Sequence, residues 1–216
     1  MSIRPPRAPV KGTRAYDSSG RRERARRQHE QALEAARALF LEHGYVATTV
    51  ESIAAAAGVS AATVYKSYGG KAGLARELVR RGLEGAGPVP AEERSNALRH
   101  SGSREEVVEG WSRFVAELAP RTAPLFLLLR DAARTDAEAA DLYAEVDEAR
   151  LKRMADNARF LADAGYLRDG VSVREARDVL WFVTTAETYD LLVTQRGWSL
   201  SKLSRFVRGV MTESLF

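Results

Sequence analysis

Two short amphipathic stretches on either side of one glycine constrain the fold more than any other feature of this sequence. Apolar residues recur at helical spacing from Val50 to Ala57, and Gly58 follows, where glycine suits the left-handed conformation after a helix. Ser60 is placed to cap a second helix, whose apolar face consists of Ala61, Val64 and Tyr68. Helices of about two turns joined so tightly predict a helix-turn-helix, with the two apolar faces packed together.

The rest of the chain repeats the helical pattern. Three segments of the form S/T-x-x-E, at Thr48–Glu51, Ser103–Glu106 and Ser172–Glu175, are typical of capping boxes that begin helices. No stretch alternates apolar and polar residues as a half-buried strand does. The sequence therefore predicts an all-α protein.

Apolar spacing and helix breakers set the limits of the predicted helices. They cover residues 24–43, 50–57, 61–68, a helix opening at 71, a helix from 103, an apolar helix around 125–129, and the segments 136–165, 173–195 and 199–214. Pro120 and Pro124 are expected to bracket a turn, because proline lacks a backbone N–H. Residues 85–102 contain few large apolar side chains and are expected to form a connection.

Charge divides the chain into a basic part and a mildly acidic part. Residues 1–86 hold 15 Lys and Arg against 8 Asp and Glu, whereas residues 87–216 hold 18 against 21, and the whole chain carries +4. This asymmetry favours a nucleic-acid-binding module in the basic part. The alternative is that the sequence is rich in arginine throughout, so that an excess of arginine in one part has no functional meaning. We expect a disordered basic arm over 1–22, a helix-turn-helix domain with a connecting helix over 23–86, and a second helical domain over 87–216.

Composition argues against an enzyme, a metal site and a membrane protein. The chain has no cysteine, and His29, His43 and His100 are scattered without metal-ligand spacing. No glycine-rich phosphate loop follows a strand, so no catalytic group and no cofactor are predicted. The apolar runs fall short of the roughly 18 residues of a membrane span, and no secretory signal is present. We therefore expect a cytoplasmic protein.

The second short helix carries an outward strip of small, hydroxyl-bearing and basic residues. The strip consists of Ala62, Thr63, Lys66 and Ser67. Small residues allow the backbone to approach base edges, hydroxyls donate or accept hydrogen bonds, and methyl groups suit thymine. A solvated surface face would also be polar, but arginines at 24, 26 and 27 lie nearby and suit phosphate contacts. The strip therefore predicts a helix that reads a DNA groove.

The segment Gln31–Leu74, QALEAARALFLEHGYVATTVESIAAAAGVSAATVYKSYGGKAGL, resembles the DNA-binding domain of the tetracycline-repressor (TetR) family. The resemblance implies a homodimer whose reading helices enter successive major grooves of a double-stranded DNA operator. It also implies that Thr49, Tyr65 and Lys71 contact phosphates, with Thr48 beside Thr49. Base contacts then fall to Ala61, Ala62, Thr63 and Lys66, with Ser60 near the DNA backbone.

For the second domain the resemblance implies ligand binding and dimerisation. Pairing through the helices near 173–195 and 199–214 is one interpretation of their apolar stripes, and closure of the monomer's own core is the other. An apolar pocket for a small-molecule effector is expected among the helices from residue 103 onwards. Its candidate wall residues, each of which could equally be core, are Trp111, Phe114, Phe126, Leu129, Tyr143, Phe160 and Trp181.

Three functions compete on these features. The first is a sequence-specific transcriptional regulator, in this family usually a repressor that a small molecule releases from its operator. The second is a non-specific architectural DNA-binding protein, which would bind random DNA as tightly as any one site. The third is a helical enzyme in the C-terminal domain, which would have to turn over a bound compound. Because the sequence has no recognisable catalytic group, the enzyme is the least favoured of the three functions.

Overall fold

The computed structural model describes residues 19–85 and 87–216, and every regular element in that part of the chain is helical. Most of the predicted basic arm, residues 1–18, lies outside the described residues, and residues 19–22 belong to the first helix. The all-α prediction is confirmed. The elements, the last but one a π-helix, are α1 (Ser19–His43), α2 (Val50–Ala57), α3 (Ala61–Tyr68), α4 (Lys71–Glu84), α5 (Ala91–Ser101), α6 (Arg104–Ala132), α7 (Ala137–Asp163), α8 (Val173–Val183), α9 (Ala186–Tyr189), η1 (Asp190–Gln195) and α10 (Leu200–Leu215).

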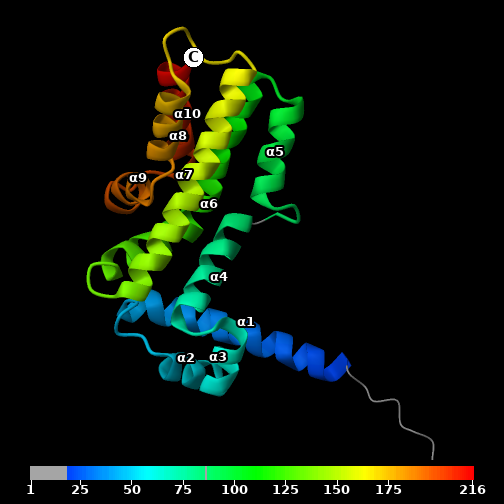
Figure 1. Cartoon of the computed structure of the whole chain (residues 1–216), viewed down its shortest axis with the longest axis vertical. Helices are drawn as coiled ribbons and strands as arrows, with labels where there is room; N and C mark the ends of the chain where they lie inside the picture. Colours follow the sequence, from blue (N-terminus) through cyan, green and yellow to red (C-terminus); the bar gives the residue numbers. More distant parts are fainter. Residues whose placement is uncertain (1–18, 86) are drawn as a thin grey trace, which may run out of the picture.

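The first three helices form a small head around a common core, at the lower end of the molecule in Figure 1. Phe40 of α1, Ile53 of α2 and Val64 of α3 are fully buried there. The ring of Tyr45 stacks on that of Phe40, with centroids 5.4 Å apart. Gly58 between α2 and α3 has a φ of 65°, the left-handed conformation that the sequence predicts. The α2–α3 pair is therefore a helix-turn-helix.

The predicted cap of α2 is wrong by one residue. Thr49 is the N-cap, and it exchanges side-chain to backbone hydrogen bonds of 3.0 and 3.1 Å with Ser52. Thr48 is buried instead, and its hydroxyl donates to the Gly44 carbonyl at 2.7 Å. Burial decides between the two adjacent threonines, because a buried hydroxyl needs a partner within the protein.

Helix α4 joins the head to the other helices (Figure 1). Its Leu74 and Val79 are buried in a core that begins in α1 and α2 and continues to Leu125 and Leu129 of α6 and Leu142 of α7. The head therefore packs directly on the lower ends of α6 and α7. Burial of apolar surface along α4 holds the head in place.

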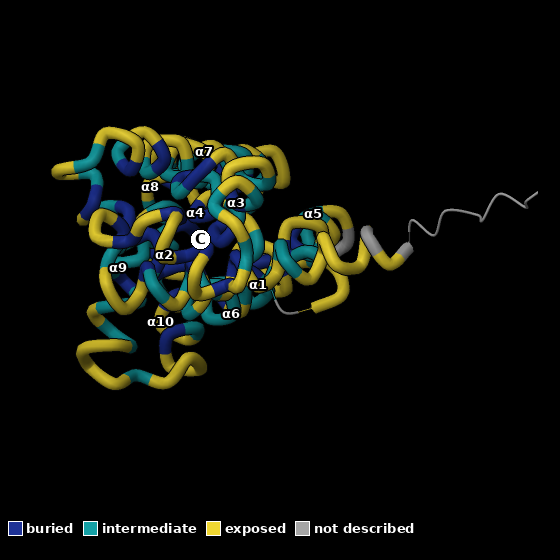
Figure 2. The backbone as a smooth tube through the Cα atoms, turned by 90° about the horizontal axis from the view of Figure 1, so that it is seen from below, coloured by how far each residue is buried: buried dark blue, intermediate teal, exposed yellow. Residues whose placement is uncertain are grey.

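The upper part of the molecule is a bundle in which α6 and α7 run side by side, with α8 and α10 next to them (Figure 1). Its core includes Trp111 of α6, Leu161 of α7, Leu180 of α8, and Leu203 and Met211 of α10. Figure 2, seen from below, shows exposed residues on the outer turns of the helices and buried residues towards the middle. No helix among the described residues has the length and apolar character needed to cross a membrane.

Two predicted breaks in helical structure are wrong. Residues 91–101 form α5, with Glu92 and Glu93 in its first turn and Arg99 and His100 in its last, an order that favours the helix dipole. Helix α6 runs without interruption through its two prolines. Packing against α4, α7 and α10 holds α6 together where propensity alone predicts a turn.

The predicted single helix over 173–195 is also wrong, because it is interrupted after Val183. The Thr184 hydroxyl donates to the Leu180 carbonyl at 3.1 Å, and the Thr185 hydroxyl accepts a hydrogen bond from Thr188 N at 3.2 Å to cap α9. Threonine side chains that bond nearby backbone groups compete with continuous helix. The π-helix η1 follows α9 directly.

Substitution of Gly73, near the start of α4, tests how closely α4 packs against the end of α3. A Cβ on Gly73 would lie 1.6 Å from the Tyr68 carbonyl oxygen, a backbone atom that cannot move alone. We expect Gly73→Ala to lower the free energy of unfolding by about 1–3 kcal/mol. Gly209→Ala on α10 is the matched control, because nothing lies within 4 Å of its added Cβ. It should be neutral or stabilising by up to about 1 kcal/mol. Urea unfolding of both variants measures this, and equal midpoints would contradict the close contact.

Candidate DNA-contacting surface and ligand cavity

Helix α3 presents the predicted strip at the surface of the head. Ala62, Tyr65 and Lys66 are exposed, and Thr63 is half-buried. Val64 faces inward and is fully buried, which fixes the rotation of the helix. Ala61 is partly buried and packs against the core.

The N-terminus of α3 is held by a local hydrogen-bond pair. The Ser60 hydroxyl accepts from Thr63 N at 3.1 Å and lies 2.8 Å from the Thr63 hydroxyl. At the other end of the strip, Ser67 Oγ lies 2.9 Å from His29 Nε2 of α1, and the Tyr68 hydroxyl donates to the His29 carbonyl at 3.1 Å. Helix α3 is therefore held at both ends, since Ser60 caps its N-terminus and Ser67 and Tyr68 bond to His29 of α1.

The residues predicted to contact phosphates lie in different surroundings. Thr49 and Tyr65 are exposed, whereas the Thr48 hydroxyl is inside the head. Lys71 Nζ donates to the Tyr45 carbonyl at 3.1 Å and lies 3.8 Å from Asp136 Oδ2, at the start of α7. The Lys71 ammonium is thus half-buried at the junction between the head and the bundle.

A second contact at this junction comes from the Tyr45 side chain. Burial, and after it the charges of Glu138 and Asp136, raise the pKa of the Tyr45 hydroxyl, which therefore stays protonated. It donates to Glu138 Oε2 at 3.4 Å. Arg76 of α4 and Glu145 of α7 add a bidentate pair at 2.9 and 2.7 Å. The start of α7 is therefore bonded both to the α1–α2 loop and to α4.

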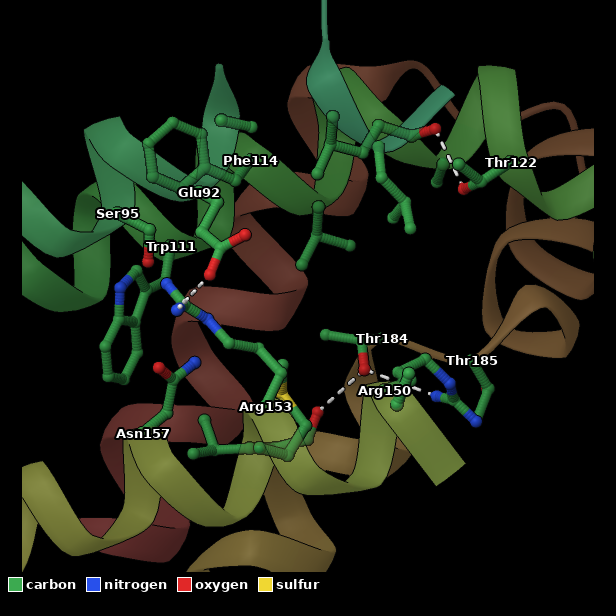
Figure 3. A pocket seen from close by; sticks show the side chains of 18 of the residues that line it. Glu92, Ser95, Trp111, Phe114, Thr122, Arg150, Arg153, Asn157, Thr184 and Thr185 are labelled. Carbon is green, nitrogen blue, oxygen red and sulfur yellow. Dashed lines mark hydrogen bonds and ion pairs between the residues drawn. The ribbon is translucent and has the colours of Figure 1, made fainter. Parts of the chain in front are cut away.

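A cavity of about 970 Å³ lies within the bundle, and Figure 3 shows it from close by. Its volume falls within the roughly 300–1,000 Å³ of small-molecule sites. One part of the wall is apolar and includes Phe114, Leu118, Phe126, Met154 and Leu180. The polar wall residues include Ser95, Asn96, Thr122, Arg150, Arg153, Asn157 and Thr184.

The predicted pocket residues divide into two groups. Trp111, Phe114, Phe126 and Tyr143 line the cavity. The other three, Leu129, Phe160 and Trp181, do not line the cavity. Leu129 is fully buried in the core shared with the head, and Phe160 packs edge-on against Trp111 with ring centroids 6.2 Å apart. The Trp181 ring lies beneath Arg150, whose Cζ is 4.6 Å from the ring centroid.

Sequence reasoning missed the polar side of the cavity. Arg150, Arg153 and Asn157 belong to the amphipathic helix α7, where charged residues usually face solvent. Ser95 and Asn96 lie on α5, a segment that the composition predicts to be a connection. No sequence signal distinguishes these residues from surface residues, because their position depends on how α5 and α7 pack.

Arg150 is held by several acceptors at one end of the cavity. Its guanidinium donates to Asp147 Oδ1 at 2.7 Å, to the Trp181 carbonyl at 3.0 Å and to the Thr184 hydroxyl at 3.3 Å. Figure 3 shows Arg150 beside Thr184 and Thr185, away from Arg153 and Trp111. Arg150 therefore joins α7 to the end of α8 and is already paired.

Helices α8 and α10 keep apolar side chains on their outer surface. Phe182 is 55% exposed, and Val173, Leu200 and Phe206 are also exposed. A shallow groove between the two helices is lined in part by Val179, Phe182 and Val210. An exposed apolar face of this kind marks a surface that can pair with another protein surface.

Comparison with known proteins finds a family for the head and a fold for the whole chain. The family described as "Bacterial regulatory proteins, tetR family" matches residues 32–78, which span the C-terminal part of α1, all of α2 and α3, and the N-terminal part of α4. A search of curated protein sequences finds no match.

Several solved structures share the fold. NalD, the secondary repressor of the MexAB-OprM multidrug efflux pump in Pseudomonas aeruginosa, superposes with a TM-score of 0.71 at 22% identity, covering 89% of this chain and 98% of NalD. The regulator FadR from Bacillus subtilis, in complex with stearoyl-CoA, gives 0.66 at 20% identity, covering 87% and 100%. A TetR-family regulator from Rhodococcus sp. gives 0.62 at 16% identity, covering 88% and 100%.

Substitution of Ser60, the N-cap of α3, tests how much this cap stabilises the helix. Ser60→Ala removes the acceptor for Thr63 N and should lower the free energy of unfolding by roughly 1 kcal/mol. Ser60→Asn is the control, since asparagine caps helices about as well as serine. Chemical denaturation of the two variants compares them. Equal destabilisation by alanine and asparagine would mean that the cap does not stabilise α3.

Proposed function

This chain carries the N-terminal domain of the tetR family of bacterial regulatory proteins, and we propose that it is a sequence-specific transcriptional regulator, a repressor released from its operator by a small molecule. The observation that carries the proposal is the outward strip on α3, mounted on a helix-turn-helix whose supporting helix α4 leads to the cavity. We place its action in the cytoplasm, where bacterial DNA lies.

The exposed side chains of α3 suit the major groove. Ala62 leaves room for close approach, Lys66 reaches base edges or phosphates, and the Thr63 methyl suits a thymine methyl. Because the Thr63 hydroxyl is already close to Ser60, its methyl is the group most available to DNA. Tyr65 and Thr49 are exposed at positions from which they would bond phosphates.

Helix α4 offers a route between cavity and DNA. Its C-terminal half contributes Arg80, Leu83 and Glu84 to the cavity wall, and its first residue, Lys71, contacts Tyr45 in the head. A ligand that binds one position of α4 more tightly than another would shift the head accordingly. A ligand with equal affinity for both positions would leave DNA binding unchanged.

We further propose a homodimer paired through α8 and α10. Their exposed apolar side chains, Phe182 above all, support this pairing, whereas the inner faces of the same helices close the monomer's own core. The interface comprises the predicted segments near 173–195 and 199–214, although the first is interrupted at Thr184. Two heads held at a fixed spacing would read two half-sites.

A non-specific architectural protein, the alternative function, differs from a regulator in its affinity for random DNA. It requires similar affinity for all duplexes, whereas a regulator prefers its operator by about 10³-fold or more over random DNA. The hydrogen bonds at both ends of α3 favour the regulator, because a helix held in one orientation presents the same side chains to each site it contacts. An enzyme in the bundle would require turnover of a bound compound.

The roles of the strip can be separated with an operator selected from random duplexes by the purified protein. Thr63→Ser, which removes the methyl and keeps the hydroxyl, and Lys66→Ala should change the preference among sites, by roughly 1–3 kcal/mol for each lost base contact. Tyr65→Phe and Lys71→Ala should weaken binding to selected and scrambled duplexes about equally. Titrations over a series of salt concentrations measure both effects.

The control for these titrations is Arg121→Ala, because Arg121 is an exposed arginine on α6 in the bundle. It should leave both affinities unchanged. Equal losses on both duplexes for the Thr63 and Lys66 variants would contradict base reading by this strip.

The proposed pairing is tested by a charge on the outer face of α8. Phe182→Glu places a carboxylate where the second subunit would bury an aromatic ring, so the chain should sediment as a monomer. Val89→Glu is the matched control, since Val89 is an exposed apolar residue in the turn before α5. Analytical ultracentrifugation compares the two variants with the original chain. Dimers that persist in Phe182→Glu would exclude this face.

A further inference from the structure

Arg153 lines one end of the cavity, and Arg99 lies outside that wall, where it bonds to the wall residue Asn157; little negative charge balances the two. Arg153 of α7 donates to Asn96 Oδ1 at 3.0 Å and lies 3.3 Å from Glu92 Oε1. Arg99 of α5 donates to Asn157 Oδ1 at 2.6 Å. The acceptors are thus mostly amide oxygens, which satisfy hydrogen bonds without neutralising a charge.

The nearby carboxylates are at the solvent side. The Glu92 side chain is 73% exposed, whereas that of Arg153 is 25% exposed. Asp156, which also borders the cavity, forms an ion pair with Arg159, and Glu93 on α5 is exposed. The deeper part of this end therefore has more positive than negative charge.

Burial makes both guanidinium groups expensive to keep charged. It lowers the pKa of Arg153, while Glu92 and Asp156 act in the opposite direction. It also lowers the pKa of Arg99, and repulsion by Arg153 lowers it further. Because arginine stays protonated at any physiological pH, both charges remain and a bound anion would stabilise them.

This end also holds buried donors without an acceptor in the described part of the chain. Trp111 is 6% exposed and lines the cavity, yet its Nε1 has no hydrogen-bond partner there. Arg99 Nε, outside the cavity wall, has none either, and the same holds for Arg150 Nε and Trp181 Nε1 near the other end. Buried polar groups in proteins are nearly always bonded. Figure 3 shows Trp111, Arg153 and Asn157 at the same end of the cavity. A ligand bearing acceptors would complete this set.

The rest of the cavity suits an apolar body. Phe114, Leu118, Phe126, Met154 and Leu180 line it, and Arg150, at its other end, is already bonded to Asp147. One end therefore offers the Arg153 charge and an unpartnered Trp111 N–H, and much of the remaining wall is apolar.

We propose that the cavity binds an amphipathic anion, with a carboxylate or similar head group on Arg153 near Trp111 and an apolar chain along Phe114, Leu118 and Phe126. This inference rests on the proposed ligand-regulated function and names the chemical class of its effector. The head group would displace or join Glu92 at Arg153.

The test compares three twelve-carbon probes that differ in the head group: laurate, dodecanol and dodecyltrimethylammonium, each below its micelle concentration. Binding to the full chain is followed by tryptophan fluorescence and checked by calorimetry. Laurate should bind at least about tenfold more tightly than dodecanol, as expected for one charge-assisted contact in a buried site. Comparable binding of dodecanol or of the cation would overturn the proposal.

Arg153→Gln keeps a hydrogen-bonding side chain but removes the charge, so it should abolish the preference for laurate while leaving dodecanol binding unchanged. Arg121→Gln, at an exposed arginine of α6 that does not line the cavity, should retain that preference. Trp111→Phe keeps the ring shape and removes the N–H, and it should weaken laurate binding several-fold. An unaltered preference in a folded Arg153→Gln variant would overturn the proposal.

A DNA titration without any probe separates this inference from the proposed function. Operator binding by a chain that does not prefer laurate over dodecanol would support the regulator and overturn the proposed ligand class. Laurate binding that depends on Arg153, in a chain that ignores duplex DNA, would do the reverse.

Discussion

The packing of α4 into two sets of helices is the contact on which the rest of the structure depends. Its Leu74 and Val79 are buried in a core that includes α1 and α2 on one side and the lower ends of α6 and α7 on the other. Fully burying such a side chain contributes about 1.5–3 kcal/mol, so this one helix face supplies much of the attachment of the head. Gly73 permits this packing, because any side chain there would strike the α3 backbone. The position of the head, and with it that of the outward strip relative to the bundle, depends on this packing.

The head could be predicted closely because its signals are local. Gly58, Ser60 and the apolar spacing around Val64 act within a few residues of themselves, and the structure places them as the sequence predicts. The bundle was predicted less well because its helices depend on contacts distant in sequence. Nothing local reveals that packing carries α6 through Pro120 and Pro124. The same limit explains the cavity, where large aromatic residues such as Phe114 were found and the polar wall of α5 and α7 was not.

Lys71 has one role implied by the family resemblance and different contacts in the structure. The family resemblance assigns it to a DNA phosphate, and the structure holds its ammonium at the Tyr45 carbonyl and near Asp136. These roles are compatible if the contacts exchange, since an ammonium has three donors and a flexible stem. A phosphate at Lys71 would then compete with Asp136, the N-cap of α7. DNA binding would weaken one bond between head and bundle, and a ligand that strengthens that bond would oppose DNA binding.

That reciprocity sets a condition on where an effector must bind. Binding free energies couple symmetrically, so a ligand that weakens DNA binding must itself bind less tightly to the DNA-bound form. The cavity meets the geometric part of this condition, because its wall includes residues of both α7 and α4. Helix α7 begins after its N-cap Asp136, and helix α4 begins at Lys71. A shift of either helix by an occupant therefore acts on one partner of the Lys71–Asp136 pair. The surface groove between α8 and α10 includes neither helix, and a molecule bound there would have to act through the pairing of two chains instead.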